Sequence, residues 1–228
     1  MIKRLKILTV STESEIITLE DADTLRAFHA YGTNGIIVEV QLRLAPARPW
    51  DQLVVIGREW EPLLEFANDP SVPKRLLSVL ENPIGSCFKP IKKIYPKDHH
   101  LIFLEVDETV ATEVVARATN AGLKTSHRIP YHYPRKAPML SDYTWNHTTL
   151  WALKSDPAWT YIQCGFGANH ADKFRKLHER FPGEILFHLE FTRSNPTTVE
   201  PATASCCGIP LVHFKSEERL REIIDYCR

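Results

Sequence analysis

The first fifty residues show an alternation of apolar and polar positions that predicts a small β-unit. Residues 3–10 and 15–19 alternate on either side of a Ser-Thr-Glu-Ser turn, so both are predicted strands. Residues 21–30 have helical spacing and begin at Asp21, a predicted N-cap. Residues 36–44 begin apolar and then alternate strictly, which makes this stretch the clearest predicted strand of the chain.

Two proline-rich segments interrupt the pattern. The first, residues 45–50, marks a predicted domain boundary, with one domain over residues 1–48 and a second over residues 49–228. The second, residues 130–138, is too long and too aromatic for a plain linker. Loops carried on a scaffold are favoured places for binding, so this connection is a candidate binding segment.

The second domain alternates predicted strands and helices. Strands are predicted at 52–56, 100–106, 123–129, 159–164, 184–192 and 209–214, and helices at 60–68, 72–80, 107–121, 142–154, 168–180 and 216–226, the last with Ser216 as N-cap. The last segment has the order β-α-β-β-α, one strand short of a ferredoxin-like unit, so we expect that the C-terminus cuts the unit. The earlier segment shares this rhythm, which indicates a duplicated layer. We therefore expect an α+β fold with a ferredoxin-like antiparallel sheet and helices on one face.

Composition excludes several classes of protein. The chain of 228 residues carries 28 basic and 28 acidic side chains, so it lacks the basic excess of proteins that bind nucleic acid by neutralising its phosphates, and we expect no nucleic-acid partner. No apolar run approaches the roughly 18 residues of a membrane helix, so we expect no transmembrane segment. The five cysteines have irregular spacing, which favours reduced thiols and a cytoplasmic location. No spacing of cysteine or histidine indicates a metal site.

One segment resembles a known family. Residues 32–44 read Gly-Thr-Asn-Gly-Ile-Ile-Val-Glu-Val-Gln-Leu-Arg-Leu. This run resembles the closing strand of the FAD-binding domain in the vanillyl-alcohol oxidase / p-cresol methylhydroxylase-type flavoproteins, whose pattern is Gly-Thr-x-Gly-Ile-Ile-Thr-Glu. Val38 replaces the usual threonine. The predicted hairpin over residues 3–19 also fits the family, and residues 142–154 resemble a stretch of its substrate domain.

The resemblance implies FAD as cofactor and a set of residues that contact it. Two closely spaced glycines permit positive φ and close approach of the backbone to a ligand. The implied cofactor contacts are Gly32, Thr33, Gly35, Ile36 and Ile37. The alternative is an ordinary turn before a strand, because Gly-x-x-Gly alone is a weak signal.

The implied substrate site lies in the second domain. His147 is the candidate catalytic base, since imidazole accepts protons near neutral pH. Arg135 is a candidate clamp for a substrate carboxylate. The other candidate substrate contacts are Tyr131, Trp145, Asn146 and Thr148. The alternatives are a helix histidine that bonds a neighbour and a surface crossover whose tyrosines cover the core.

The family resemblance implies an activity and shows which of the family's segments do not appear. The implied reaction is oxidation of a hydroxy acid or related alcohol, with hydride transfer to flavin and onward transfer to an unspecified electron acceptor. The glycine-rich pyrophosphate loops of the family do not appear in these residues, nor does a His-Pro-Gly-Asp-Gly-Asn-x-His segment. We therefore expect a fragment that is inactive alone, with a small-molecule substrate and a second copy in a homodimer as partners. The alternative function is a non-catalytic ferredoxin-like α+β binding domain.

Overall fold

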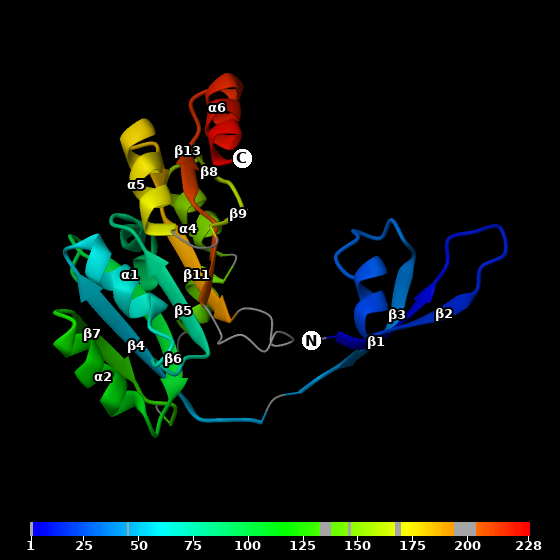
Figure 1. Cartoon of the computed structure of the whole chain (residues 1–228), viewed down its shortest axis with the longest axis horizontal. Helices are drawn as coiled ribbons and strands as arrows, with labels where there is room; N and C mark the ends of the chain where they lie inside the picture. The colour runs from blue at the N-terminus through cyan, green and yellow to red at the C-terminus, as the bar shows by residue number, and fades with distance from the viewer. Residues whose placement is uncertain (1, 45, 133–137, 146, 167–169, 194–203) are drawn as a thin grey trace. The chain divides into compact units, whose positions relative to one another are not determined.

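The chain divides into two compact units, Met1–Arg48 and Pro49–Arg228 (Figure 1). The structure is a computed structural model that describes residues 2–44, 46–132, 138–145, 147–166, 170–193 and 204–228. None of the helices within these ranges is long and apolar enough to cross a membrane.

The first unit is a three-stranded antiparallel sheet with one short helix. Its elements are β1 (Ile2–Leu8), β2 (Ile16–Glu20), the 3-10 helix η1 (Asp21–Arg26) and β3 (Ile36–Leu42), and the strand order is β2-β1-β3. The predicted helix over 21–30 is therefore shorter than expected. His29 and Tyr31 have positive φ (62° and 52°), a backbone conformation that a continuing helix excludes.

The core of the first unit is small. Its buried apolar residues are Leu5, Ile7, Leu19 and Ala27. Eleven large apolar side chains of the same unit are at least 40% exposed, and five of them lie on β3. They are Val10, Ile16, Leu25, Phe28, Tyr31, Ile36, Ile37, Val38, Val40, Leu42 and Leu44. So few buried side chains leave the unit with little hydrophobic stabilisation of its own.

The second unit is built on a seven-stranded antiparallel sheet of order β7-β4-β6-β5-β11-β12-β9. Its strands are β4 (Trp50–Gly57), β5 (Leu76–Leu80), β6 (His100–Asp107), β7 (Lys124–Ile129), β9 (Cys164–Gly165), β11 (His188–Arg193) and β12 (Ala204–Gly208). A small sheet of order β10-β13-β8 joins β8 (Trp159–Tyr161), β10 (Ile185–Leu186) and β13 (Leu211–His213). The helices are α1 (Trp60–Asn68), α2 (Ala111–Asn120), α3 (Ser141–Thr144), α4 (Thr148–Ser155), α5 (His170–Arg180) and α6 (Glu217–Cys227), with the 3-10 turns η2 (Ile84–Cys87) and η3 (Lys89–Ile91).

The first half of this sheet is a complete ferredoxin-like unit. Residues 50–129 run β4-α1-β5-β6-α2-β7, and their strands lie in the order β7-β4-β6-β5. That is the fourth-first-third-second arrangement of a β-α-β-β-α-β motif. The second half repeats the pattern in reverse across the sheet, with β11, β12 and β9 as its second, third and first strands. The two halves meet where β5 pairs with β11.

Helices cover both faces of the large sheet. Side chains of α1, α2, α5 and α6 share one apolar core with alternate residues of the strands, such as Leu53 and Val55 of β4. Side chains of α3, α4 and η2 share a second core with the other residues, such as Val54 and Ile56. The α+β class with antiparallel sheets is confirmed, whereas the helices are distributed over two faces instead of the expected one.

The predicted helix at 72–80 is wrong. Its second half forms strand β5, and all of its residues, Leu76–Leu80, are buried between β6 and β11. A short apolar run has no helical or strand period of its own, so tertiary pairing on both edges decides the outcome. The predicted helix at 142–154 is instead two short helices, α3 and α4, which are interrupted at Trp145.

Candidate functional site

The turn before β3, which we call the glycine turn, contains two glycines, Gly32 and Gly35, in different environments. Gly35 has φ of 124°, and a Cβ there would lie 2.8 Å from the carbonyl oxygen of Leu8. Glycine at this position is therefore required by the close approach of β1. Gly32 has φ of 77°, and nothing lies within 4 Å of where its Cβ would be. The backbone at Gly32 is therefore open to a molecule that approaches it.

The other predicted cofactor contacts of the first unit lie next to this turn. The Thr33 hydroxyl donates to the Ala30 carbonyl at 2.6 Å, which closes the turn. Ile36 and Ile37 are 57% and 42% exposed. An open main chain beside exposed apolar side chains fits the flat ring or the sugar chain of FAD.

The first unit is less suited to contact with the charged pyrophosphate of FAD. The Lys6 ammonium bonds Glu39 at 2.8 Å, and Arg4 lies 3.3 Å from the same carboxylate. Their bonds lower the pKa of Glu39, with the Lys6 hydrogen bond as the main cause. Arg43 bonds Asp21 at 2.9 Å. Because these cations already have partners, the first unit fits an apolar and main-chain contact with the cofactor rather than a pyrophosphate cradle.

The predicted substrate residues around α4 lie in contrasting environments. His147 precedes the helix and is exposed, with Nδ1 3.1 Å from the carbonyl oxygen of Asp142. Trp145 is 51% exposed. Thr148 is buried, and its hydroxyl lies 3.4 Å from the carbonyls of Tyr143 and Thr144. Asn146 lies outside the described residues.

The predicted binding connection is held at both ends by buried polar residues of β4. The Asp51 carboxylate accepts from the Tyr131 backbone N–H at 2.9 Å and from the Arg128 guanidinium at 2.8 Å. The Gln52 Oε1 accepts from the Leu140 N–H at 2.6 Å. Tyr131 itself is 41% exposed. The predicted clamp Arg135 lies outside the described residues.

A buried polar cluster lies under α3, and sequence reasoning missed it. The Glu190 carboxylate of β11 accepts from the Ser78 hydroxyl of β5, at 2.9 Å to Oε1 and 2.8 Å to Oε2. The His188 Nε2 lies 2.7 Å from Glu190 Oε1. The Thr144 hydroxyl of α3 lies 2.9 Å from that of Ser78. These four residues, which we call the Glu190 cluster, are 8% exposed or less.

The Glu190 cluster retains unused hydrogen-bonding capacity. A carboxylate offers about four acceptor sites, and two side-chain donors, Ser78 and His188, reach Glu190. The His188 Nδ1 is a buried polar atom without a partner in the described structure. Buried polar atoms without partners are costly, so each one calls for an explanation, and a bound group is one such explanation. The arrangement can accept a hydrogen bond or a proton from a bound hydroxyl group.

The chemistry of the cluster is not that of a serine nucleophile. A nucleophilic triad needs histidine between serine and carboxylate, whereas here Glu190 lies between Ser78 and His188. Cys207 of β12 faces Glu190 across the strand pair. Burial, and secondly the Glu190 carboxylate, raises the pKa of the Cys207 thiol, so this thiol is a poor nucleophile.

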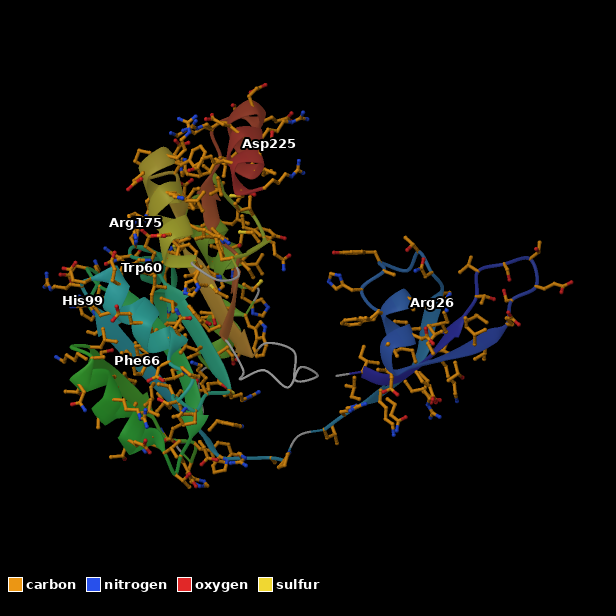
Figure 2. All side chains as sticks on the ribbon, in the orientation of Figure 1. Arg26, Trp60, Phe66, His99, Arg175 and Asp225 are labelled. Carbon is orange, nitrogen blue, oxygen red and sulfur yellow. The ribbon has the colours of Figure 1, made fainter. Side chains whose placement is uncertain are left out.

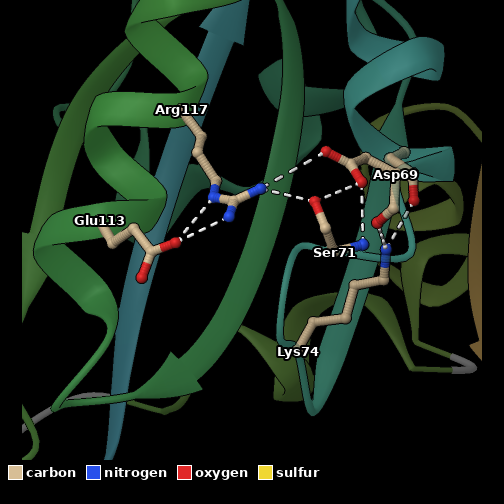
Figure 3. A network of polar contacts seen from close by, with 6 residues as sticks. Asp69, Ser71, Lys74, Glu113 and Arg117 are labelled. Atoms are coloured by element: carbon tan, nitrogen blue, oxygen red, sulfur yellow. Dashed lines mark hydrogen bonds and ion pairs between the residues drawn. The ribbon is translucent and has the colours of Figure 1, made fainter.

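A second polar network, around Arg117 on the opposite face of the sheet, is closed on itself (Figure 3). The Arg117 guanidinium donates to Glu113 at 2.7 Å and to the Ser71 hydroxyl at 2.5 Å. Asp69 accepts from the hydroxyl and the N–H of Ser71, which are the first causes of its lowered pKa. The Lys74 ammonium donates to the carbonyls of Ala67 and Asp69. With its groups bonded to one another, this network ties α2 to the loop after α1.

Metal ligands do not gather in the parts of the chain that the structure describes, where no group of three or more His, Cys, Asp or Glu could hold an ion. Burial raises the pKa of Cys164 to about 12. It also raises the pKa of Cys206 and Cys227. These three thiols pack against the first core and fit a structural role.

Comparison with known proteins gives a fold and no family. No protein-family model matches the chain, and no curated protein does. Among solved structures, the chain is similar to an alkyldihydroxyacetonephosphate synthase, with 11% identity and a TM-score of 0.61. The match covers 97% of this chain and 46% of that protein, so the chain spans about half of the protein it resembles. At this identity the likeness shows the fold, and it extends over both units.

Proposed function

We propose that this chain is part of an FAD-dependent oxidoreductase that oxidises a substrate hydroxyl group by hydride transfer to flavin. The observation that carries the proposal is the fold likeness over both units, which includes the turn and strand singled out by the flavoprotein resemblance. Because the chain matches 46% of the similar structure, most cofactor contacts would come from residues beyond this sequence.

In this proposal each unit of the chain has its own role. Gly32, Ile36 and Ile37 would contact FAD through main chain and apolar side chains, and the bound flavin would take up the hydride. The second unit would bind and orient the substrate on the sheet face that carries the Glu190 cluster.

Glu190 fits the role of proton acceptor better than His147 does. Its carboxylate is 8% exposed and is held by donors from two other positions, so its geometry is fixed before a substrate arrives. His147 is exposed and its Nδ1 already contacts a backbone carbonyl. A buried carboxylate also disfavours a second uncompensated negative charge. The Glu190 cluster therefore favours the neutral alcohol over the hydroxy acid as substrate class.

A flavin titration tests the cofactor part of the proposal. Residues 1–228 are mixed with FAD, and binding is followed by flavin fluorescence and by the visible spectrum. We expect FAD binding that is weak in residues 1–228, that Ile36→Asp weakens further, and that Leu153→Asp, at an exposed apolar residue of α4, leaves unchanged. The titration is repeated with any upstream coding sequence of the gene included. Absence of saturable FAD binding by both proteins, when folded, would contradict the proposal and favour a flavin-free α+β binding domain.

A further inference from the structure

A second pair of buried polar side chains lies beside the Glu190 cluster, on the same face of the large sheet. Gln52 of β4 pairs with Glu105 of β6, so their side chains lie next to each other. Phe103, two residues before Glu105, pairs with Ser78 of the cluster. Because residues two apart on a strand share a face, Glu105 and Ser78 are diagonal neighbours, which in a sheet are about 7–8 Å apart.

Each member of this pair has one polar group in use and one to spare. Glu105 is 1% exposed, and its Oε2 accepts from the Arg75 guanidinium at 3.0 Å. The Oε1 of Glu105 has no hydrogen-bond partner among the residues that the structure describes. The Oε1 of Gln52 accepts from the Leu140 N–H at 2.6 Å, which leaves the Gln52 amide nitrogen as a donor. A buried acceptor and a donor therefore lie side by side, and they are not bonded to each other.

One short segment lies over both polar pairs. The Leu140 N–H bonds Gln52, and the Thr144 hydroxyl at the end of α3 lies 2.9 Å from that of Ser78. Helix α1, on which Figure 2 labels Phe66, covers the opposite face of the sheet. The two polar pairs thus share the space between the sheet and α3.

A hydroxyl group is the simplest group that satisfies both Glu105 and Gln52. It donates one hydrogen bond, which the Glu105 Oε1 can accept, and it accepts another, which the Gln52 amide can donate. An ammonium group would meet the Gln52 donor without an acceptor of its own. A carboxylate would add a negative charge beside the buried carboxylates of Glu105 and Glu190.

We propose that the substrate carries a second hydroxyl group, which Gln52 and Glu105 bind while the first hydroxyl group lies at the Glu190 cluster. The substrate class is then a diol or a longer polyol, with a few carbon atoms between the two groups. This inference rests on the proposed function for the reaction at the first hydroxyl group. The site for the second group depends on Gln52 and Glu105 alone.

Binding to residues 1–228 is tested with pentan-1-ol and pentane-1,5-diol, which share one carbon chain. The Kd of each is measured from the shifts of backbone amide signals. Burial of apolar surface alone would favour pentan-1-ol, because the diol is the more polar molecule. We expect the diol to bind at least about fivefold more tightly, since a hydrogen bond to a charged acceptor outweighs that difference. Equal or weaker binding of the diol, or no saturable binding of either alcohol, would overturn the proposal.

A pair of matched variants assigns the site. In Glu105→Gln the amide oxygen can stay with Arg75, so a donor replaces Oε1, and the Kd of the diol should rise about fivefold or more. Glu184→Gln removes another buried carboxylate that an arginine bonds, Arg219 of α6, and it should leave the Kd unchanged. Weakening by both variants, or by neither, would contradict the assignment. If Glu105→Gln does not fold, the comparison of the two alcohols on the unmodified chain still decides.

Flavin reduction separates this inference from the proposed function. In a flavin-loaded enzyme that contains this chain, both alcohols are supplied without oxygen and kcat/KM is compared. Equal values for the two alcohols would overturn the second hydroxyl site and leave the proposed function in place. Tighter binding of the diol without flavin reduction by either alcohol would contradict the proposed function and support the site.

Discussion

The buried Glu190 connects several elements of the second unit. Its carboxylate joins β5, β11 and, through the Ser78 hydroxyl, helix α3. A buried carboxylate is stable only when donors compensate for its lost hydration. The same donors fix its orientation, which is what a proton acceptor in an active site requires.

Removal of this carboxylate should be costly to stability. Glu190→Ala leaves His188 buried without its carboxylate partner and leaves the Thr144 hydroxyl as the remaining acceptor for Ser78, so we expect a loss of about 1–3 kcal/mol in the free energy of unfolding. Urea unfolding followed by circular dichroism measures it. A double-mutant cycle with Ser78→Ala should give a coupling energy of about 1 kcal/mol or more. Additive effects would show that the Ser78–Glu190 contact contributes nothing.

The same residue carries a catalytic prediction. In a flavin-loaded enzyme that contains this chain, Glu190→Gln keeps the shape of the side chain and removes its ability to take a proton. Anaerobic flavin reduction by a substrate alcohol should slow by about 10²-fold or more. His147→Gln is the matched control, and it should change the rate little. The opposite ranking would return the role of base to His147.

The two glycines of the first unit should respond differently to substitution. Gly35→Ala places a Cβ 2.8 Å from the Leu8 carbonyl at φ of 124°, so we expect a loss of about 2–3 kcal/mol. The added Cβ of Gly32→Ala meets no neighbour, and only the φ of 77° is unfavourable. We therefore expect a loss of about 1 kcal/mol in the free energy of unfolding. Hydrogen exchange of the β1–β3 ladder compares them. Equal protection in both variants would contradict the steric argument.

Among the helices and strands, the predictions from the sequence are most accurate where the apolar residues follow one clear period. Helix α1 begins and ends at the predicted residues, and the predicted Ser216 N-cap of α6 accepts a hydrogen bond from the Arg219 N–H. The stretch Leu76–Leu80 was predicted wrongly because burial on both faces removes any period. Ser78 is the polar residue within that buried strand. It is the signal that could have indicated a polar partner on a neighbouring strand.

The attachment of α6 should depend on pH through Glu184. Hydrogen bonds from Arg219 and then Lys215 lower the pKa of Glu184 to about 2, against about 4.3 in an unfolded chain. A lowered pKa contributes stability above the unfolded value, and this contribution is lost as pH falls from about 5 toward 2. Its size is on the order of 2 kcal/mol.

Urea unfolding at pH 7 and pH 3 measures this contribution. Glu184→Gln should lower stability at pH 7 and lose most of that difference at pH 3. Glu179→Gln, at an exposed residue of α5, should match the unmodified chain at both values. A difference between Glu184→Gln and the unmodified chain that stays constant with pH would contradict the ion-pair origin.

The two units of the molecule differ in the size of the apolar core that each buries. The second unit has two large apolar cores, whereas the first has four buried apolar residues and eleven exposed large ones. Residues 49–228 alone should therefore unfold in one cooperative thermal transition, and residues 1–48 alone should show no folded spectrum. Circular dichroism of the two peptides checks this, and a cooperative transition in the shorter one would contradict it.

The candidate sites could be predicted from the sequence only where residues are neighbours along the chain. The glycine turn is such a case, since Gly32, Gly35 and Ile36 lie within a few residues. The Glu190 cluster is not, because Ser78 and Glu190 are joined by the register of β5 and β11 across 112 positions. No single sequence reveals that register, so contact between these residues follows from topology alone.

The meeting of β5 and β11 has a consequence for how the site arose. Both are the second strands of ferredoxin-like halves, and they pair antiparallel, so a local twofold axis runs between them near Ser78 and Glu190. Two identical copies of one half would place the same residue on each side of that axis. A serine that donates to a glutamate is an unequal pair, and it becomes available only when the two halves have separate sequences. Because both halves belong to one chain, their sequences can differ. The junction of β5 and β11 can therefore carry a serine on one strand and a glutamate on the other.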